Sequence, residues 1–77
     1  MAKTLRDLRE EALLTQIELA EKVGVAYQRI GEWERGQFAP RTPTRRKLCE
    51  AFGISPAELV AALRATQEEA VKGEAAA

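Results

Sequence analysis

The sequence predicts an all-α fold of five helices, and three observations support this class. The segments TQIE at residues 15–18 and SPAE at residues 55–58 place a Ser or Thr three residues before a Glu, the pattern of a capping box at a helix start. Gly24, Gly36 and Gly53 each follow an apolar-periodic segment, where a glycine commonly ends a helix. No stretch alternates apolar and polar residues as a half-buried strand does.

The first two helices are predicted from apolar spacing and from the capping box. Helix 1 is expected over about residues 3–13, with Leu5, Leu8 and Ala12 on one face. Helix 2 begins after Thr15 and ends near Gly24, since glycine adopts the left-handed conformation there without a Cβ clash.

The remaining three helices follow from the same kinds of signal. Helix 3 is expected over about residues 26–35 and helix 4 over about residues 44–52, joined by the loop at residues 36–43. Helix 5 begins after Ser55, with proline at its first position, and runs past Thr66. We therefore predict a compact domain over residues 1–66, with residues 67–77 either extending helix 5 or forming a frayed Ala/Glu-rich tail.

The composition limits the classes of protein and site that this chain can provide. With 77 residues, 45% of them hydrophobic and 31% charged, we expect one small soluble domain. Neither a signal peptide nor a run long enough to span a bilayer is present, so we expect a cytoplasmic location and no membrane partner. One cysteine, Cys49, and no histidine argue against the usual zinc sites and nucleophile pairs. We expect no metal, no cofactor and no enzymatic activity.

The charges are unevenly distributed although their sum is zero. Residues 1–25 carry four Lys/Arg and five Asp/Glu, residues 26–47 carry six and two, and residues 48–77 carry two and five. The net charges of the three sectors are therefore −1, +4 and −3. A neutral chain with one basic sector can still bind phosphate locally.

The predicted third helix has one apolar arc and one polar arc. At about 100° per residue, Ala26, Ile30 and Trp33 share the inner arc with Glu34. The other arc is expected to be free, and it holds Tyr27, Gln28, Gly31, Glu32 and Arg35. A glycine inside a helix costs about 1 kcal/mol relative to alanine, so Gly31 suggests a close approach to the backbone. The alternative is that this arc is only a solvated surface.

The combination of "TQIELAEKVGV", "IGEWERG" and "LCEAFGISPAEL" resembles the phage-repressor-like helix-turn-helix family of the Cro and xenobiotic-response-element type. The resemblance covers Leu5 to about Leu63. It implies a five-helix lambda-repressor-like domain whose third helix enters the major groove of double-stranded DNA. The implied function is that of a sequence-specific transcriptional regulator, more specifically a repressor. The alternative is a protein-interaction module of the same fold, such as an antitoxin or a coactivator-like adaptor.

The resemblance also implies roles for individual residues. Four residues of the third helix are expected to contact bases: Tyr27, Gln28, Gly31 and Glu32. Residues expected to contact phosphates are Gln16, Arg35, Arg41, Arg45 and Arg46. An ion pair is expected between Arg9, which falls on the apolar face of helix 1, and Glu34, and the family has one at the matching positions.

The sequence departs from the family pattern at two places. Relatives often carry Ser or Thr near residue 26, where it caps helix 3, whereas Ala26 provides no side-chain cap. The loop at residues 36–43 varies among relatives, which puts contacts carried over onto Gln37, Phe38 or Arg41 in doubt. The role of Phe38 stays open.

One recognition helix covers few base pairs, so we expect a homodimer on a palindromic operator. The expected surface is a stripe on helix 5 and the tail, formed by Leu59, Ala62, Leu63, Thr66 and Ala70, with Val60 and Val71 beside it. The alternative is that this stripe covers the domain's own core.

Overall fold

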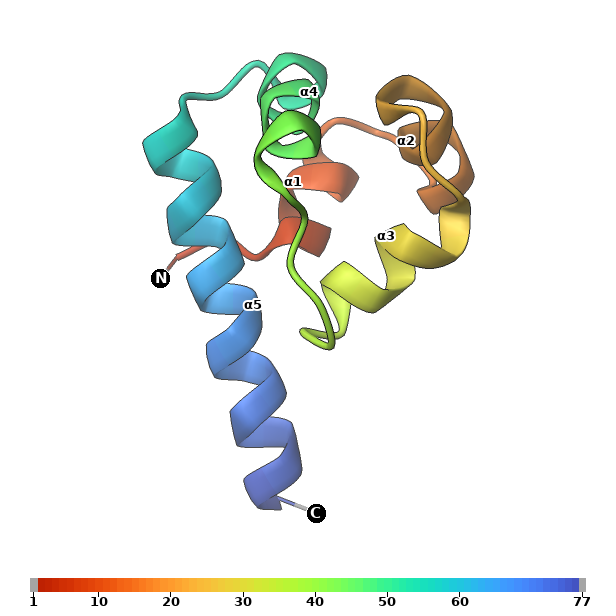
Figure 1. Ribbon diagram of the computed structural model, residues 1–77. Helices are drawn as coiled ribbons and strands as arrows, with labels where there is room; N and C mark the ends of the chain where they lie inside the picture. Colours follow the sequence, from red (N-terminus) through yellow and green to blue (C-terminus); the bar gives the residue numbers. More distant parts are fainter. Residues whose placement is uncertain (1, 77) are drawn as a thin grey trace.

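The computed structural model describes residues 2–76, with side chains described through Lys72. Within this part of the chain the secondary structure is helical throughout, with no strand, as the sequence predicted. The helices follow one another along the chain as shown in Figure 1: α1 Leu5–Glu11, α2 Gln16–Val23, α3 Tyr27–Glu34, α4 Thr42–Phe52 and α5 Pro56–Ala76.

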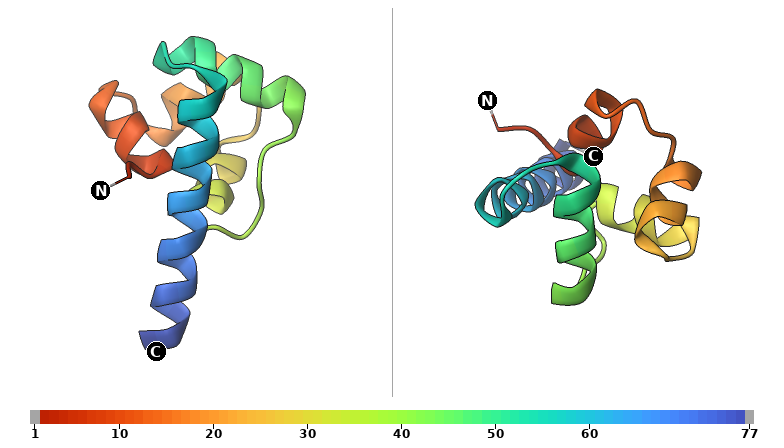
Figure 2. Two further views of the ribbon diagram at one scale, coloured as in Figure 1. Left: turned by 90° about the vertical axis from the view of Figure 1, so that its left-hand side faces the viewer. Right: turned by 90° about the horizontal axis from the view of Figure 1, so that it is seen from above.

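The first four helices surround one core, and α5 closes it from the side of α1 and α4. The C-terminal end of α5 projects beyond the other helices, and α2 lies on the opposite side of the domain from α5 (Figures 1 and 2). Every helix contributes to the core, whose buried members are Leu5, Leu19, Ala20, Val23, Ile30, Trp33, Leu48 and Leu59. No helix in the described part is both long and apolar enough to traverse a bilayer.

Both predicted capping boxes are present. The Thr15 hydroxyl accepts a hydrogen bond from the Glu18 backbone amide, and the Glu18 carboxylate accepts one from the Thr15 backbone amide. Ser55 and Glu58 exchange the same two bonds at the start of α5. Gly24 and Gly53 end α2 and α4 with positive φ angles of 72° and 65°. These short-range signals were therefore sufficient to locate the helix ends they concern.

Helix α1 is shorter than predicted because a capping box that the prediction missed sets its start. Thr4 and Asp7 exchange side-chain and backbone bonds, so the helix begins at Leu5 rather than Lys3. The helix ends at Glu11, and Leu13, in the turn that follows, has a positive φ of 59°. Ala12 is consequently exposed, and its predicted place on the buried face was wrong.

Helix α4 begins at Thr42 rather than at the predicted Thr44. Pro43 lies in its first turn. Proline has the φ angle that a helix requires, and its lack of an N–H costs nothing there, because amides of the first turn have no partner within the helix. Helix α3 begins after Ala26, which makes no side-chain capping bond, in agreement with the departure noted in the sequence.

The predicted stripe on α5 covers the domain's own core. Leu59, Ala62 and Thr66 are at most 3% exposed. The Thr66 hydroxyl accepts the Leu5 amide at 3.0 Å and donates to the Ala62 carbonyl at 2.8 Å, so it holds the start of α1. The prediction that this stripe is an exposed surface for binding a second copy of the chain was therefore wrong. The exposed valines beside it, Val60 and Val71, are a different surface.

The end of α3 packs directly against α5 at Gly36. This glycine has a φ of 74°, and a Cβ atom there would lie 2.7 Å from the Ala70 Cβ. The Gln67 amide donates to the Gly36 carbonyl at 2.8 Å. Because the neighbouring atom belongs to a packed helix, any larger residue would push α5 away from the end of α3.

Replacing Gly36 with alanine should therefore destabilise the fold more than the same change at Gly53. Gly53 also has a positive φ but nothing within 4 Å of an added Cβ, so Gly53→Ala carries backbone strain alone, about 1–2 kcal/mol. Gly36→Ala adds the overlap with Ala70, a further cost of about 1–3 kcal/mol. Urea unfolding of both variants measures the difference, and equal losses would contradict the packing described for α5.

Candidate nucleic-acid interface

Helices α2 and α3 form two short segments joined at a tight turn. Gly24 ends α2 in the left-handed conformation, and the Val25 amide returns to the Ala20 carbonyl at 3.0 Å. The inner faces of the two helices supply Leu19, Ala20, Val23, Ile30 and Trp33 to the core. The small Ala20 and the glycine at the bend allow two helix axes to cross closely.

A buried ion pair joins α1 to α3. Arg9 donates from Nε to Glu34 Oε2 at 2.5 Å and from Nη2 to Glu34 Oε1 at 3.1 Å. The two side chains are 12% and 6% exposed. Hydrogen bonding to Glu34 raises the pKa of the Arg9 guanidinium above its ordinary value, although burial acts in the opposite direction. Both charges therefore depend on each other for compensation.

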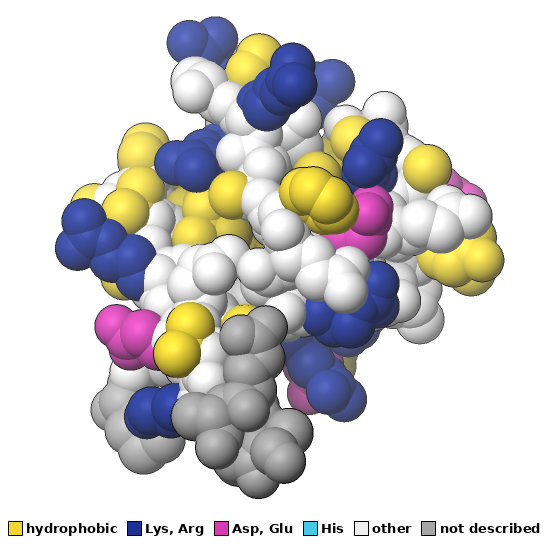
Figure 3. Space-filling view, turned by 60° about the horizontal axis from the view of Figure 1, so that its bottom comes forward, with side chains coloured by type: hydrophobic (Ala, Val, Ile, Leu, Met, Phe, Trp, Pro, Cys, Tyr) yellow, Lys and Arg dark blue, Asp and Glu magenta, His cyan; other side chains and the backbone are white. Residues whose placement is uncertain are grey.

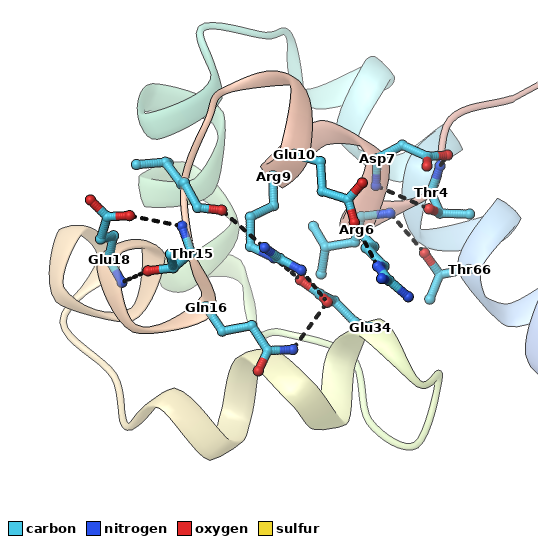
Figure 4. A network of polar contacts seen from close by, with 12 residues as sticks. Thr4, Arg6, Asp7, Arg9, Glu10, Thr15, Gln16, Glu18, Glu34 and Thr66 are labelled. Atoms are coloured by element: carbon cyan, nitrogen blue, oxygen red, sulfur yellow. Dashed lines mark hydrogen bonds and ion pairs between the residues drawn. The ribbon is translucent and has the colours of Figure 1, made fainter.

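Two further bonds extend this ion pair to α2 and to the turn before it, as Figure 4 shows. Arg9 Nη1 donates to the Leu14 carbonyl at 2.9 Å, and Gln16 Nε2 donates to Glu34 Oε1 at 3.2 Å. The bond from Gln16 to Glu34 was not predicted, because Gln16 was expected only to contact a phosphate at the protein surface. The network ties α1, α2 and α3 together and so fixes the orientation of α3.

The face of α3 opposite the core is polar and open to solvent. Tyr27 is 51% exposed, Gln28 and Arg35 are exposed, and Glu32 is partly buried. Gly31 is buried beneath the Arg35 side chain. A shallow hollow on this face brings together the predicted α3 residues and the predicted residue of α2, and it is lined by Gln16, Tyr27, Gln28, Gly31, Glu32, Arg35 and Gln37.

Glu32 forms an ion pair that the sequence interpretation missed. Arg29 Nη1 lies 3.3 Å from Glu32 Oε1, with the Arg29 side chain 61% exposed. The spacing of three residues along a helix is the signal that could have indicated this pair. The pair partly neutralises the one carboxylate on the free face of α3.

The start of α4 carries the basic residues predicted to contact phosphates. Arg41 and Arg46 are exposed, whereas Arg45 is partly buried and donates from Nε to the Pro40 carbonyl at 2.8 Å. No side chain caps this helix start, and its first turn contains no acidic residue. Free amides and nearby arginines together favour an anion.

A groove connects the start of α4 with α3. Its lining includes Arg29 and Trp33 from α3, Arg41 and Thr44 beside the start of α4, and Phe38 from the loop between the two helices. Phe38 remains 58% exposed, so it is not enclosed in the core. Lys and Arg side chains gather over the upper part of the face shown in Figure 3, with few acidic side chains among them. Across the described residues, no group of acidic or cysteine side chains is arranged to hold a metal ion.

Comparison with known proteins agrees with this geometry. A helix-turn-helix family model matches residues 5–59. The "Cryptic phage CTXphi transcriptional repressor RstR" of Vibrio cholerae is 35% identical over 68 residues, which cover 88% of this chain and 61% of the repressor. An "Uncharacterized HTH-type transcriptional regulator" of Methanothermobacter thermautotrophicus is 40% identical over 53 residues, which cover 69% of this chain and 77% of that protein. No solved structure matches the chain.

The chain belongs to the helix-turn-helix family, since the match spans α1 to the first turn of α5. This agrees with the resemblance inferred from the sequence. The chain spans 61% of the length of the Vibrio repressor, less than two thirds.

Removing Glu34 tests the importance of the buried ion pair. Glu34→Ala should lower the free energy of unfolding by about 3–5 kcal/mol, because Arg9 is left as an uncompensated buried charge. Glu10→Ala is the matched control: Glu10 pairs with Arg6 at 2.7 Å, but both side chains are more than half exposed, and the expected loss is below about 1 kcal/mol. Chemical denaturation measures both. A loss below about 0.5 kcal/mol for Glu34→Ala would contradict the role given to the pair.

Proposed function

We propose that this protein is a sequence-specific, DNA-binding transcriptional regulator, more specifically a repressor, that inserts α3 into the major groove. The observation that carries the proposal is the division of α3 into two faces. Ile30, Trp33 and Glu34 are held against the rest of the domain, and the opposite face presents Gln28 and Arg35 to solvent. A major groove admits a helix with such a face.

The names of the two relatives support regulation of transcription as the purpose of this binding. The proposed place of action is the cytoplasm. Enzymatic activity has no part in the proposal.

In this proposal the free face of α3 contacts bases through Tyr27, Gln28 and Glu32, whereas Gly31, expected from the sequence to contact a base, is buried beneath Arg35 and makes no contact of its own. Gln28 is the principal contact, since a glutamine amide can bond an adenine through two parallel hydrogen bonds. Glu32 is paired with Arg29. Its carboxylate can still accept a hydrogen bond from a cytosine amino group, and it disfavours bases that present no donor at that place.

Phosphate contacts come from the two helix starts that flank α3. Arg41 and Arg46 are exposed at the uncapped start of α4 and act as clamps. Arg45 contributes charge, although its Nε is already bonded to Pro40. Gln16 uses one amide hydrogen for Glu34, and its second N–H remains for a phosphate at the start of α2.

Two kinds of variant separate phosphate clamping from base recognition. Arg41→Ala and Arg46→Ala should weaken binding to preferred and random duplexes alike and lower the salt slope by about one each. Gln28→Ala should cost about 1–3 kcal/mol on the preferred duplex and little on random duplex. Arg45→Ala is less informative because it also removes the bond to Pro40.

The preferred duplex is obtained by selection from a random pool, and affinities are measured by fluorescence anisotropy at two salt concentrations. If Gln28→Ala weakens both duplexes equally, its role in base recognition is wrong. If the unaltered protein binds no duplex at either salt concentration, the protein-interaction alternative replaces the proposed function.

We further propose that the protein binds a palindromic operator as a homodimer through the outer face of α5. Val60 and Val71 are 38% and 60% exposed and lie eleven residues apart, close to three helical turns. Val60 lines the two grooves beside α5, one toward α4 and one toward the loop before α4. An antiparallel pairing of two α5 helices places Val60 beside Val71 and Arg64 near Glu68 of the second copy, so apolar and opposite charges match.

Sedimentation of the protein on its selected duplex tests the dimer. Two protomers per site are expected, with the two α3 helices about 34–36 Å apart and half-sites about 10 base pairs centre to centre. The double variant Val60→Asp/Val71→Asp should lower the affinity of the second protomer. Leu13→Asp is the matched control, since Leu13 is 88% exposed and lies in the α1–α2 turn. One unaltered protomer per site at saturation would exclude the dimer.

A further inference from the structure

The Arg35 side chain lies across the free face of α3, over Gly31. A Cβ atom added at Gly31 would lie 2.9 Å from Arg35 Nη1 and 3.7 Å from its Cζ. The guanidinium therefore folds back by about one helical turn, from the end of α3 toward its middle. A larger residue at position 31 would displace the guanidinium from this place.

Among the described residues, the two carboxylates of α3 are both bonded to other arginines. Glu32 pairs with Arg29, and Glu34 pairs with Arg9. Arg35 Nη2 donates to Gln37 Oε1 at 3.5 Å, which is long for an N–H···O contact. Because a guanidinium has five N–H donors, most donors of Arg35 are open to a ligand.

Arg35 and Gln28 point from the same side of α3, since they are seven residues apart. Both line the hollow on the free face, with Gly31 between them. A helix rises about 1.5 Å per residue. The Arg35 guanidinium, which lies over Gly31, is therefore about 4.5 Å along the helix axis from the Cα of Gln28. The Gln28 side chain and the Arg35 guanidinium therefore lie within about one helical turn of each other, on the face of α3 proposed to enter the major groove.

We propose that Arg35 recognises a guanine next to the base pair that Gln28 contacts, and that Gly31 is the gap that admits its guanidinium. A guanidinium can donate two parallel hydrogen bonds to O6 and N7 of guanine in the major groove. This inference rests on the proposed function, in which α3 lies in that groove. It makes Arg35 a determinant of sequence specificity in place of the phosphate contact expected from the sequence.

The test compares duplexes selected from a random pool by the unaltered protein, by Arg35→Ala and by Arg35→Lys. The unaltered protein should select a guanine at one fixed position, next to the position whose preference Gln28→Ala removes. Arg35→Ala should lose that preference, with a fall of about 5- to 150-fold in affinity for the guanine-containing duplex. Arg35→Lys should keep the salt slope but lose the preference for guanine, because lysine keeps the positive charge but lacks the planar guanidinium that donates two parallel hydrogen bonds.

Two further measurements probe the contact and the gap separately. Replacing the selected guanine with 7-deazaguanine removes the N7 acceptor, which should weaken binding of the unaltered protein and leave Arg35→Ala unaffected. Gly31→Ala should reduce the guanine preference when Arg35 is present and should have no such effect in the Arg35→Ala background. Thermal unfolding of each variant verifies that the fold is retained.

Two results would overturn the inference alone. One is a loss for Arg35→Ala that is equal on preferred and random duplexes and lowers the salt slope by about one, the behaviour of a phosphate contact. The other is a guanine preference that survives in Arg35→Ala. The absence of any sequence preference in the unaltered protein would instead overturn the proposed function, and this inference with it.

Discussion

The contact between Arg9 and Glu34 decides where α3 lies. Both side chains are almost removed from solvent, so each charge has lost most of its hydration and depends on the other for compensation. That requirement draws α1 and α3 together. The same two groups bond the Leu14 carbonyl and the Gln16 amide, so the turn before α2 and the start of α2 are set by the same contact.

A helix fixed in this way has one defined outer face. The start of α3 is held by the Gly24 turn and its inner side by Glu34 and the core. Its end is held by the packing of Gly36 against α5, whose Gln67 side chain donates to the Gly36 carbonyl. A rigid support of this kind restricts the rotation of α3 about its axis. The side chains proposed to contact bases are therefore held at a fixed angle before any partner arrives, which lowers the entropy lost on binding.

The acidic residues of the chain explain how a neutral protein presents a basic surface. Asp7 and Glu18 accept amide bonds in capping boxes, which lower the pKa of both carboxyl groups. Glu34 and Glu32 are paired with arginines. Many carboxylates thus neutralise helix starts or other side chains, whereas Arg41 and Arg46 remain exposed at the uncapped start of α4. The distribution of charge, more than its sum, sets the local potential.

The sequence by itself determined the helical class, two capping boxes, and the ends of α2 and α4, because these features depend on residues within about one helical turn of each other. It also indicated which residues share a helical face, but periodicity does not say what covers that face. Thr66 was expected at an exposed stripe, and only the packing of α1 against α5 made its hydroxyl the buried partner of the Leu5 amide. The bond from Gln16 to Glu34 and the position of Arg35 over Gly31 likewise needed three-dimensional positions. The tertiary structure decided these features because they depend on distances between side chains, which the spacing of residues along the chain does not fix.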